Sequence, residues 1–237
     1  SYNIQYVANL SVDEVQNGID SIFHVINKSL STYLPQSDIS KINRGDTTLV
    51  VDHHFRAVFE KATEVWKATG GYFDPTVGVL VNAYGFGPGK SISDLNPKQK
   101  DSLLSLTGWQ KIQLRQDNII KKESPHIYLD FNAIAKGYTV DIVGDFLLKS
   151  VSFDFMVEIG GEIVARGNSP KTGQAWKIAI ENPRQGGKLD FLHTLTLRDQ
   201  ALASSGNYRK YRIDTITGER FVHSINPLNG SGLKTNI

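Results

Sequence analysis

Asp74 stands in a stretch of the sequence that suggests binding chemistry. It opens the run Asp-Pro-Thr, which follows a predicted helix end and precedes a glycine-rich stretch at residues 85–89. A carboxylate beside exposed backbone amides suits a polar ligand. The same residue also suits a structural role, because an aspartate before a proline commonly caps the N-terminus of a helix. The sequence leaves both interpretations open.

Asp130 and Lys136 form a second candidate site. Asp130 ends a predicted strand, and residues 133–138 begin the helix that follows it. Strand ends that lead into helix N-termini commonly hold phosphates and cations, because unpaired amides point outward there. The charge of Lys136 opposes the helix dipole, so its side chain either has an anionic partner or extends into solvent.

Two further segments combine glycine with polar neighbours. Gly160 and Gly161 interrupt a strand pattern between two glutamates, which indicates either a β-bulge or a close approach of the backbone to a ligand. Ser204 and Ser205 precede Gly206, which indicates either a turn or a phosphate contact. Neither segment identifies a ligand by itself.

His223 lies in an apolar stretch that we predict to be a strand. A single histidine there is either a satisfied structural residue or a catalytic one. The other five histidines of the six lack the spacing of metal ligands, and the adjacent pair His53 and His54 should point in different directions from a helix start. We therefore expect no zinc site.

Composition narrows the class of protein. The chain has 237 residues, 40% of them hydrophobic and 21% charged, with a formal net charge of +2. It is long enough for a substantial core and too apolar for a disordered protein. With 26 basic and 24 acidic side chains there is no broad electropositive face, so nucleic acid is not an expected partner.

The absence of cysteine excludes disulfides, thiolate metal sites and a cysteine nucleophile, and it slightly favours an oxidising compartment.

Hydrophobic periodicity predicts the elements that would position these residues. Helical spacing of apolar residues predicts helices at residues 12–33, 55–69, 97–106 and 133–147. Strands are predicted at residues 1–8, 112–114, 127–129, 153–158, 162–166, 176–181 and 194–197, and in a hairpin that pairs 208–214 with 219–225. Because the helices concentrate early and the strands late, we predict an α+β fold, one large domain with two lobes, mixed sheets and flanking helices.

Six segments, in this order, resemble the ApbE-like flavin transferases. They are residues 30–43, 71–78, 129–138, 159–162, 204–206 and 223–227. Each segment alone would be a weak match, whereas six in the family's order make a specific one. The resemblance implies a fold related to the T-fold.

The resemblance also implies an activity and its residues. Such an enzyme is an FAD:protein FMN transferase, which uses Mg²⁺ to cleave the pyrophosphate of FAD, attaches FMN to a Ser or Thr hydroxyl of an acceptor flavoprotein, and releases AMP. His223 would be catalytic, near the reacting phosphate, and the carbonyl of Ala133 would bind the metal, which prefers oxygen ligands. The implied FAD-binding residues are Tyr33, Tyr72, Phe73, Asp74, Asp130, Lys136 and Ile225.

The sequence departs from the family pattern at its C-terminal end. The family continues past the segment that matches residues 230–237 into a strand and a helix, which carry an Asp and a Thr that complete the magnesium site. The ApbE-like domain at residues 1–237 is therefore expected to lack these elements, either because the sequence is trimmed or incomplete or because the protein is a natural variant with half a metal site. We favour the first, since the sheet edge would otherwise lack a partner strand.

Two other activities compete with transfer. One is a Mg²⁺-dependent FAD pyrophosphatase that gives FMN and AMP, and the other is a non-catalytic FAD-binding lipoprotein. The resemblance implies that the residue at the position of Tyr33 influences this balance, and an aromatic residue there is similar to the transferases. The resemblance and the lack of cysteine predict export to the periplasmic face of the bacterial inner membrane, with a lipid anchor upstream as the only membrane contact. The acceptor is expected to be a subunit of a membrane redox complex.

Overall fold

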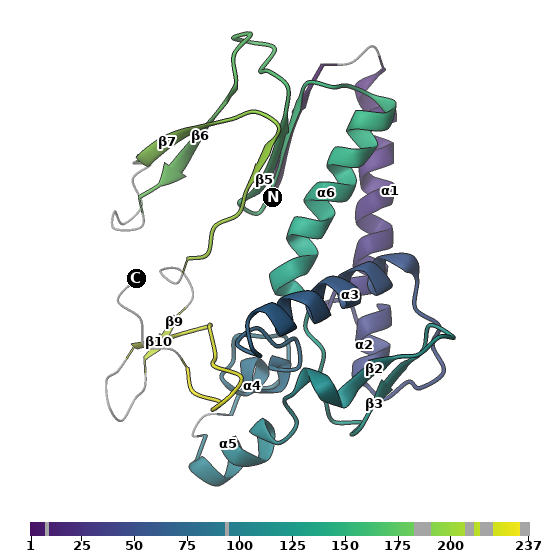
Figure 1. Cartoon of the computed structure of the whole chain (residues 1–237), viewed down its shortest axis with the longest axis vertical. Helices are drawn as coiled ribbons and strands as arrows, with labels where there is room; N and C mark the ends of the chain where they lie inside the picture. Colours follow the sequence, from purple (N-terminus) through teal and green to yellow (C-terminus); the bar gives the residue numbers. More distant parts are fainter. Residues whose placement is uncertain (8–9, 93–94, 183–190, 207–210, 214–219, 233–237) are drawn as a thin grey trace. The chain divides into compact units, whose positions relative to one another are not determined.

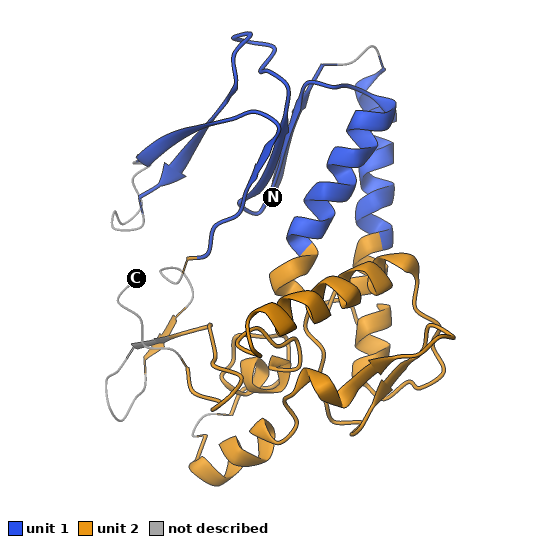
Figure 2. Ribbon diagram, in the orientation of Figure 1, with its two compact units in different colours: residues 1–25, 136–205 blue, residues 26–135, 206–237 orange. Residues whose placement is uncertain are grey.

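The computed structural model divides into two compact units (Figures 1 and 2). It describes residues 1–7, 10–92, 95–182, 191–206, 211–213 and 220–232. Unit 1 comprises residues 1–25 and 136–205, and unit 2 comprises residues 26–135 and 206–237. Two of the boundaries between the units fall near the ends of long helices.

Unit 1 is a four-stranded antiparallel sheet with two helices on one face and a hairpin on the other. The strand order is β1-β4-β5-β8, and the hairpin is β6-β7. The strands are β1 (Tyr2–Tyr6), β4 (Phe155–Ile159), β5 (Glu162–Arg166), β6 (Trp176–Glu181), β7 (Phe191–Leu197) and β8 (Gln200–Leu202). The helices are α1 (Val12–Leu30) and α6 (Asn132–Ser150), which lie side by side in Figure 1.

Alternation along β4 explains the two cores of unit 1. Phe155 and Val157 pack against α1 and α6, whereas Met156 packs against the hairpin, as expected when successive side chains point to opposite faces of a sheet. The helix-side core contains Val15, Ile19, Val140, Val143 and Leu147. The hairpin-side core contains Ile163, Ala165, Trp176, Ile178 and Leu197.

Unit 2 is built from one long helix, several short helices and two small hairpins. Its helices are α2 (Asp38–Asn43), α3 (His53–Ala68), α4 (Gly78–Ala83), α5 (Pro97–Leu104) and the 3-10 turn η1 (Trp109–Lys111). Its strands are β2 (Ile112–Leu114) paired with β3 (Ile120–Lys122), and β9 (Tyr211–Ile213) paired with β10 (Arg220–Val222).

Helix α3 carries the aromatic core of unit 2. The ring of Phe55 meets that of Phe131 edge-on at 5.4 Å, and the ring of Phe59 lies 4.6 Å from Trp109. The helix begins where Asp52 accepts a hydrogen bond of 2.8 Å from the backbone N–H of Phe55, a regular N-cap. This core supports the segments on either side of it, including the one that leads into α6.

Most predicted elements agree with the structure, and the α+β class is confirmed. Two strand predictions are wrong, and some elements, helix α2 among them, are not predicted. Residues 127–129 form no strand, because β2 pairs instead with β3, and Tyr128 makes a single bridge. Helix α2 is an element that the apolar periodicity does not predict. His223 lies in a bend just past β10 rather than within a strand.

The glycine pair at 160–161 is a hairpin turn rather than a bulge. Ile159 pairs with Glu162 across it, and the two glycines have φ values of 57° and 96°. A two-residue turn of this hand requires positive φ at both central positions, which glycine adopts without steric cost. The two serines at 204 and 205 are exposed and lie outside regular structure. Among the helices that the structure describes, none has both the length and the hydropathy that a membrane span requires.

Candidate functional site

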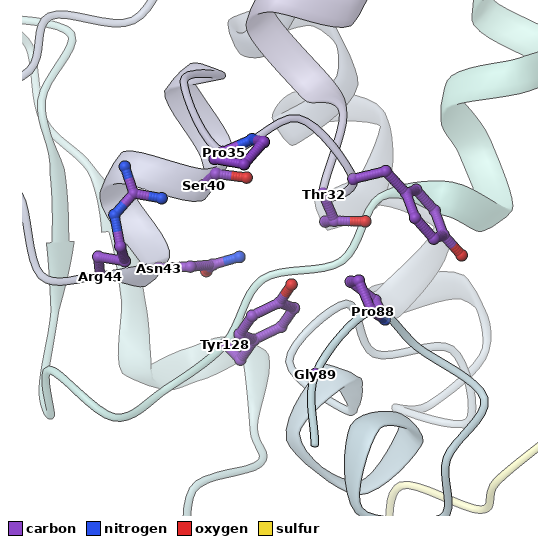
Figure 3. Close-up of a pocket in the computed structure, with 9 residues that line it drawn as sticks. Thr32, Pro35, Ser40, Asn43, Arg44, Pro88, Gly89 and Tyr128 are labelled. Carbon is purple, nitrogen blue, oxygen red and sulfur yellow. The ribbon is translucent and has the colours of Figure 1, made fainter. Parts of the chain in front are cut away.

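A cavity of about 320 Å³ in unit 2 gathers residues from distant parts of the sequence. Its lining comes from the loop after α1, from α2, from the glycine-rich loop and from the segment before α6. Figure 3 shows the polar ends of Ser40, Asn43 and Tyr128 directed toward a common space. The other lining residues are Tyr33, Pro35, Arg44, Pro88 and Gly89.

Two serines hold the loop that carries Tyr33. The hydroxyls of Ser37 and Ser40 both donate to the carbonyl of Ser31, at 2.6 and 3.3 Å. Ser37 also caps α2 by accepting from the backbone N–H of Ser40 at 3.2 Å. The loop is therefore tied to the helix, and Tyr33 is 59% exposed at its edge while Thr32 is buried.

Asn43 fixes α2 against the segment before α6. Its side-chain amide donates to the carbonyl of Leu129 at 2.9 Å, and its oxygen accepts from the N–H of Leu129 at 2.7 Å. Burial raises the pKa of the Tyr128 phenol, an effect that hydrogen bonds with Asn82 and Asn43 partly oppose. Tyr128 therefore enters the cavity as a neutral hydrogen-bonding group.

The glycine-rich loop folds over Asn82. The side-chain oxygen of Asn82 accepts from the N–H of Gly89 at 3.0 Å. A Cβ on Gly87 would lie 2.1 Å from that oxygen, and one on Gly89 would lie 2.7 Å from the Asn82 Cγ. The glycines thus allow the loop to approach a side chain closely, which places Gly89 at the cavity.

The Asp-Pro-Thr run lies beside the segment that leads into α6. Val77 forms a parallel β-bridge with Tyr128, and the N–H of Asp130 donates to the carbonyl of Pro75 at 2.9 Å. A Cβ on Gly78 would lie 2.6 Å from the Tyr128 ring, so this approach requires glycine. The structure therefore brings together two of the segments that carry the family resemblance.

Asp74 is buried, and its carboxylate is occupied by the protein itself. One oxygen accepts from the N–H and the hydroxyl of Thr76 at 2.8 and 2.6 Å, and the other accepts from the N–H of Trp109 at 2.8 Å. Asp74 does not cap α4, whose N-cap is Val77 without a side-chain hydrogen bond. The capping interpretation is wrong, and a direct contact between Asp74 and FAD stays a prediction.

Asp130 is half-buried at the start of α6. Its carboxylate accepts from the N–H of Asn132 at 2.7 Å. Burial raises the pKa of the Asp130 carboxyl, although hydrogen bonds from Asn132 lower it in part. A cation or hydrogen-bond donor beside this carboxylate would therefore stabilise its charged form.

Lys136 has the anionic partner that its position on α6 suggested. Its ammonium lies 2.7 and 2.8 Å from the two carboxylate oxygens of Glu162. Both residues belong to unit 1, in which Glu162 follows the glycine turn. The Lys136 side chain is 51% exposed, so the pair remains accessible to a polar ligand.

His223 contacts the glycine-rich loop. Its ring meets Phe86 edge-on at 6.3 Å, and its Nδ1 is buried without a hydrogen-bond partner among the described residues. Arg212 holds the same loop, because its guanidinium donates to the carbonyl of Gly85 at 2.9 Å and lies 5.8 Å from the Phe86 ring. A buried imidazole nitrogen without a partner calls for a functional or structural explanation.

The remaining predicted residues have varied surroundings. Tyr72 is 67% exposed, Phe73 is half-buried, and Ala133 is exposed in the first turn of α6. Ile225 is 9% exposed and packs with Leu80 in a core cluster of unit 2. The contacts of these residues with FAD stay predictions.

The described residues do not form a complete magnesium centre. Among them, no three His, Cys, Asp or Glu side chains lie close enough together to hold a metal ion. Ala133 can contribute only a backbone carbonyl, whereas Mg²⁺ requires near-octahedral oxygen coordination. Its assignment as a metal ligand stays a prediction.

Tyr128, Ser40 and Arg44 line the cavity but are not among the predicted binding residues. Tyr128 falls in a predicted strand, where an aromatic side chain suggests packing. Ser40 and Asn43 belong to a segment of the family resemblance, which is the only signal that points to them. Arg44 follows α2, which the periodicity does not reveal.

Comparisons with known proteins relate the whole chain to flavin transferases. A family model described as "ApbE family" matches residues 1–237. The FAD:protein FMN transferase of Haemophilus influenzae is 34% identical over 97% of this chain and 69% of its own length. That of Vibrio cholerae is 32% identical over 100% of this chain and 71% of its own length.

Solved structures agree with the sequence matches. The flavin transferase ApbE from Vibrio cholerae has a TM-score of 0.84 at 31% identity and covers 98% of this chain and 74% of its own. The apo form of the Pseudomonas stutzeri flavinyl transferase ApbE has a TM-score of 0.83 at 28% identity, over 98% of this chain and 72% of its own. The chain thus resembles about three quarters of each of these structures.

Proposed function

Because this chain belongs to the ApbE family, we propose that it is an FAD:protein FMN transferase. It binds FAD, transfers the FMN portion to a Ser or Thr hydroxyl of an acceptor flavoprotein, and releases AMP. The observation that carries this proposal is the joining of four matched segments within unit 2. Residues 30–43, 71–78, 129–132 and 223–227 are far apart in the sequence yet connected by the contacts described above.

The cavity is a suitable site for part of FAD. A ring system requires apolar or aromatic walls with a few placed polar groups, and the cavity provides Tyr33 and Tyr128 together with Ser40 and Asn43. Arg44 supplies a positive charge at the same site. At about 320 Å³ the cavity is at the small end of ligand pockets, so we assign it one portion of the dinucleotide rather than the whole.

His223 is the residue that we assign to the reacting phosphate. The acceptor oxygen bonds to the phosphorus of the FMN portion, its proton passes to the imidazole, and the bond between that phosphorus and the bridging oxygen breaks. The electron pair leaves with AMP. The Nδ1 of His223 supports this role, because it is buried and has no hydrogen-bond partner among the described residues, and a nitrogen that makes no structural hydrogen bond can accept a proton.

We also propose that the transfer depends on Mg²⁺. This proposal is supported by the chemistry of the reaction, because a bound cation neutralises the negative charge of the pyrophosphate and so favours its cleavage. Among the described residues we assign only the Ala133 carbonyl to the metal. Loss of turnover in EDTA and recovery with Mg²⁺ would support the dependence, and full activity in EDTA would contradict it.

A mass measurement tests the transferase activity. The protein is incubated with FAD, Mg²⁺ and an acceptor flavoprotein domain, and the acceptor is weighed by mass spectrometry. We expect a gain equal to FMN, with an equal amount of AMP, and no gain when the acceptor hydroxyl is replaced by alanine. Free FMN and AMP with an unmodified acceptor would instead identify a pyrophosphatase. Bound FAD without AMP would identify a flavin-binding protein.

We further propose that the protein acts at the periplasmic face of the bacterial inner membrane, on a subunit of a membrane redox complex. The family resemblance and the absence of cysteine support this location. Fractionation of cells that express the whole protein tests it, because recovery in the cytosol alone would contradict the proposal.

A further inference from the structure

Lys122 is a half-buried lysine that makes its hydrogen bonds to the backbone. Its ammonium donates to the carbonyls of Ile42, Pro125 and Ile127 at 2.8, 2.9 and 2.9 Å. An ammonium has three hydrogens, so these three carbonyls satisfy it completely. The side chain projects from β3, and no carboxylate neutralises it in the described part of the chain.

Two of the carbonyls that accept from Lys122 belong to residues next to the cavity lining. Ile42 immediately precedes Asn43, and Ile127 immediately precedes Tyr128, and both following residues line the cavity. Lys122 therefore holds the backbone next to one residue on each of two cavity walls. The carbonyl of Ile42 also lies at the C-terminal end of α2, where a positive charge is favourable.

A second connection joins the same two walls. The amide of Asn43 makes two hydrogen bonds to the backbone of Leu129 on the segment that contains Tyr128. The Asn43 amide by itself is one point of attachment, about which the two walls could rotate. With Lys122 there are two points, and these set both the separation and the orientation of the walls.

We propose that Lys122 is a positioning residue for FAD binding, which holds the Asn43 wall and the Tyr128 wall of the cavity in register. This inference rests on the proposed function, because it takes the cavity as part of the FAD site. Lys122 itself does not line the cavity, so its effect passes through the two backbone segments that it joins.

The charge of Lys122 provides a readout that a simple packing role would not change. Burial lowers the pKa of Lys122 to about 8. Above that pH the neutral amine has only two hydrogens, and its lone pair would face one of the three carbonyls. The charged or titratable groups on the neighbouring elements are Asp38, Lys41, Arg44, Lys111, Lys121, Glu123, His126 and Tyr128. None of them contributes to the lowered pKa, which has burial as its cause.

The test measures FAD affinity by equilibrium dialysis at pH 7 and pH 9, without an acceptor. The variants are Lys122→Met, Lys122→Arg and, as a matched control, Lys121→Met, because Lys121 is exposed on the same strand. We expect Lys122→Met to bind FAD about 10-fold more weakly at pH 7, because the carbonyls of Ile42, Pro125 and Ile127 lose their shared donor. The wild type and Lys121→Met should lose affinity at pH 9, whereas Lys122→Arg, which stays charged, should not.

The outcomes separate this inference from the proposed function. FAD affinity of Lys122→Met equal to that of Lys121→Met at both pH values would overturn the positioning role and leave the transferase proposal intact. If Lys122→Met fails to fold, the test relies on Lys122→Arg. A loss of FAD affinity at pH 9 in Lys122→Arg equal to the loss in the wild type would also overturn the positioning role. A wild type that binds no FAD would overturn both.

Discussion

Asn43 and Leu129 are joined by two hydrogen bonds although 86 residues separate them in the sequence. One side-chain amide satisfies both the N–H and the carbonyl of a single backbone residue, as a neighbouring strand would. Helix α2 thereby replaces a strand as the partner of the segment that leads to Asp130. The pairing sets the position of Tyr128 and of the start of α6, and several predictions depend on this arrangement.

Replacing Asn43 with alanine should destabilise the fold and weaken FAD binding. The variant leaves the N–H and carbonyl of Leu129 without their partner, which should lower the free energy of unfolding by about 1–3 kcal/mol. Urea denaturation measures this, with Asn27→Ala as the control because Asn27 is exposed on α1. Equal unfolding midpoints for the two variants would contradict the structural role of Asn43.

Replacing His223 with alanine should lower the rate of FMN transfer without weakening FAD binding. If His223 takes the proton of the attacking hydroxyl, FMN transfer should fall by about 10²- to 10⁴-fold while FAD affinity changes little. His24→Ala, an exposed histidine on α1, should leave transfer unchanged. A loss of folded protein without a selective loss of turnover would show that His223 is structural.

Two glycine substitutions should have opposite effects on stability. A Cβ at Gly78 would lie 2.6 Å from the ring of Tyr128 and 3.1 Å from Cβ of Asp130, so Gly78→Ala should cost about 1–3 kcal/mol. A Cβ at Gly137, within α6, would meet no atom of another segment within 4 Å, so Gly137→Ala should gain about 0.5–1 kcal/mol. Thermal unfolding compares both with the wild type, and similar melting temperatures for the two variants would refute the close approach at Gly78.

The protein should lose stability in mild acid through His54. Burial lowers the pKa of His54 from its ordinary value of 6.5, so the unfolded chain takes up a proton at a higher pH than the folded one. The free energy of unfolding should therefore fall as the pH drops below about 6.5. His54→Gln should flatten this fall between pH 6.5 and 5, whereas His24→Gln should not. Parallel pH profiles for His54→Gln and the wild type would contradict the prediction.

Local patterns in the sequence are enough to predict the long elements and the family. Helices α1, α3 and α6 show apolar residues at helical spacing, and this signal needs no information about the partner surface. The pairing of β9 with β10 is also predicted, since these strands are close in sequence. The predicted turn between them, at residues 217–218, lies outside the described residues. The six ordered segments predict the ApbE family, which the comparisons confirm.

Tertiary structure decided the roles of individual side chains in the candidate site. Asp74 resembles a helix cap in the sequence, but one of its carboxylate oxygens is taken by Trp109, 35 residues away. Lys122 resembles an ordinary surface lysine until the fold places three carbonyls around it. Residue types and short spacings determine which helices and turns form, because those depend on neighbours along the chain. Which groups share a hydrogen bond or a cavity depends on contacts between distant segments, and these exist only in the folded protein.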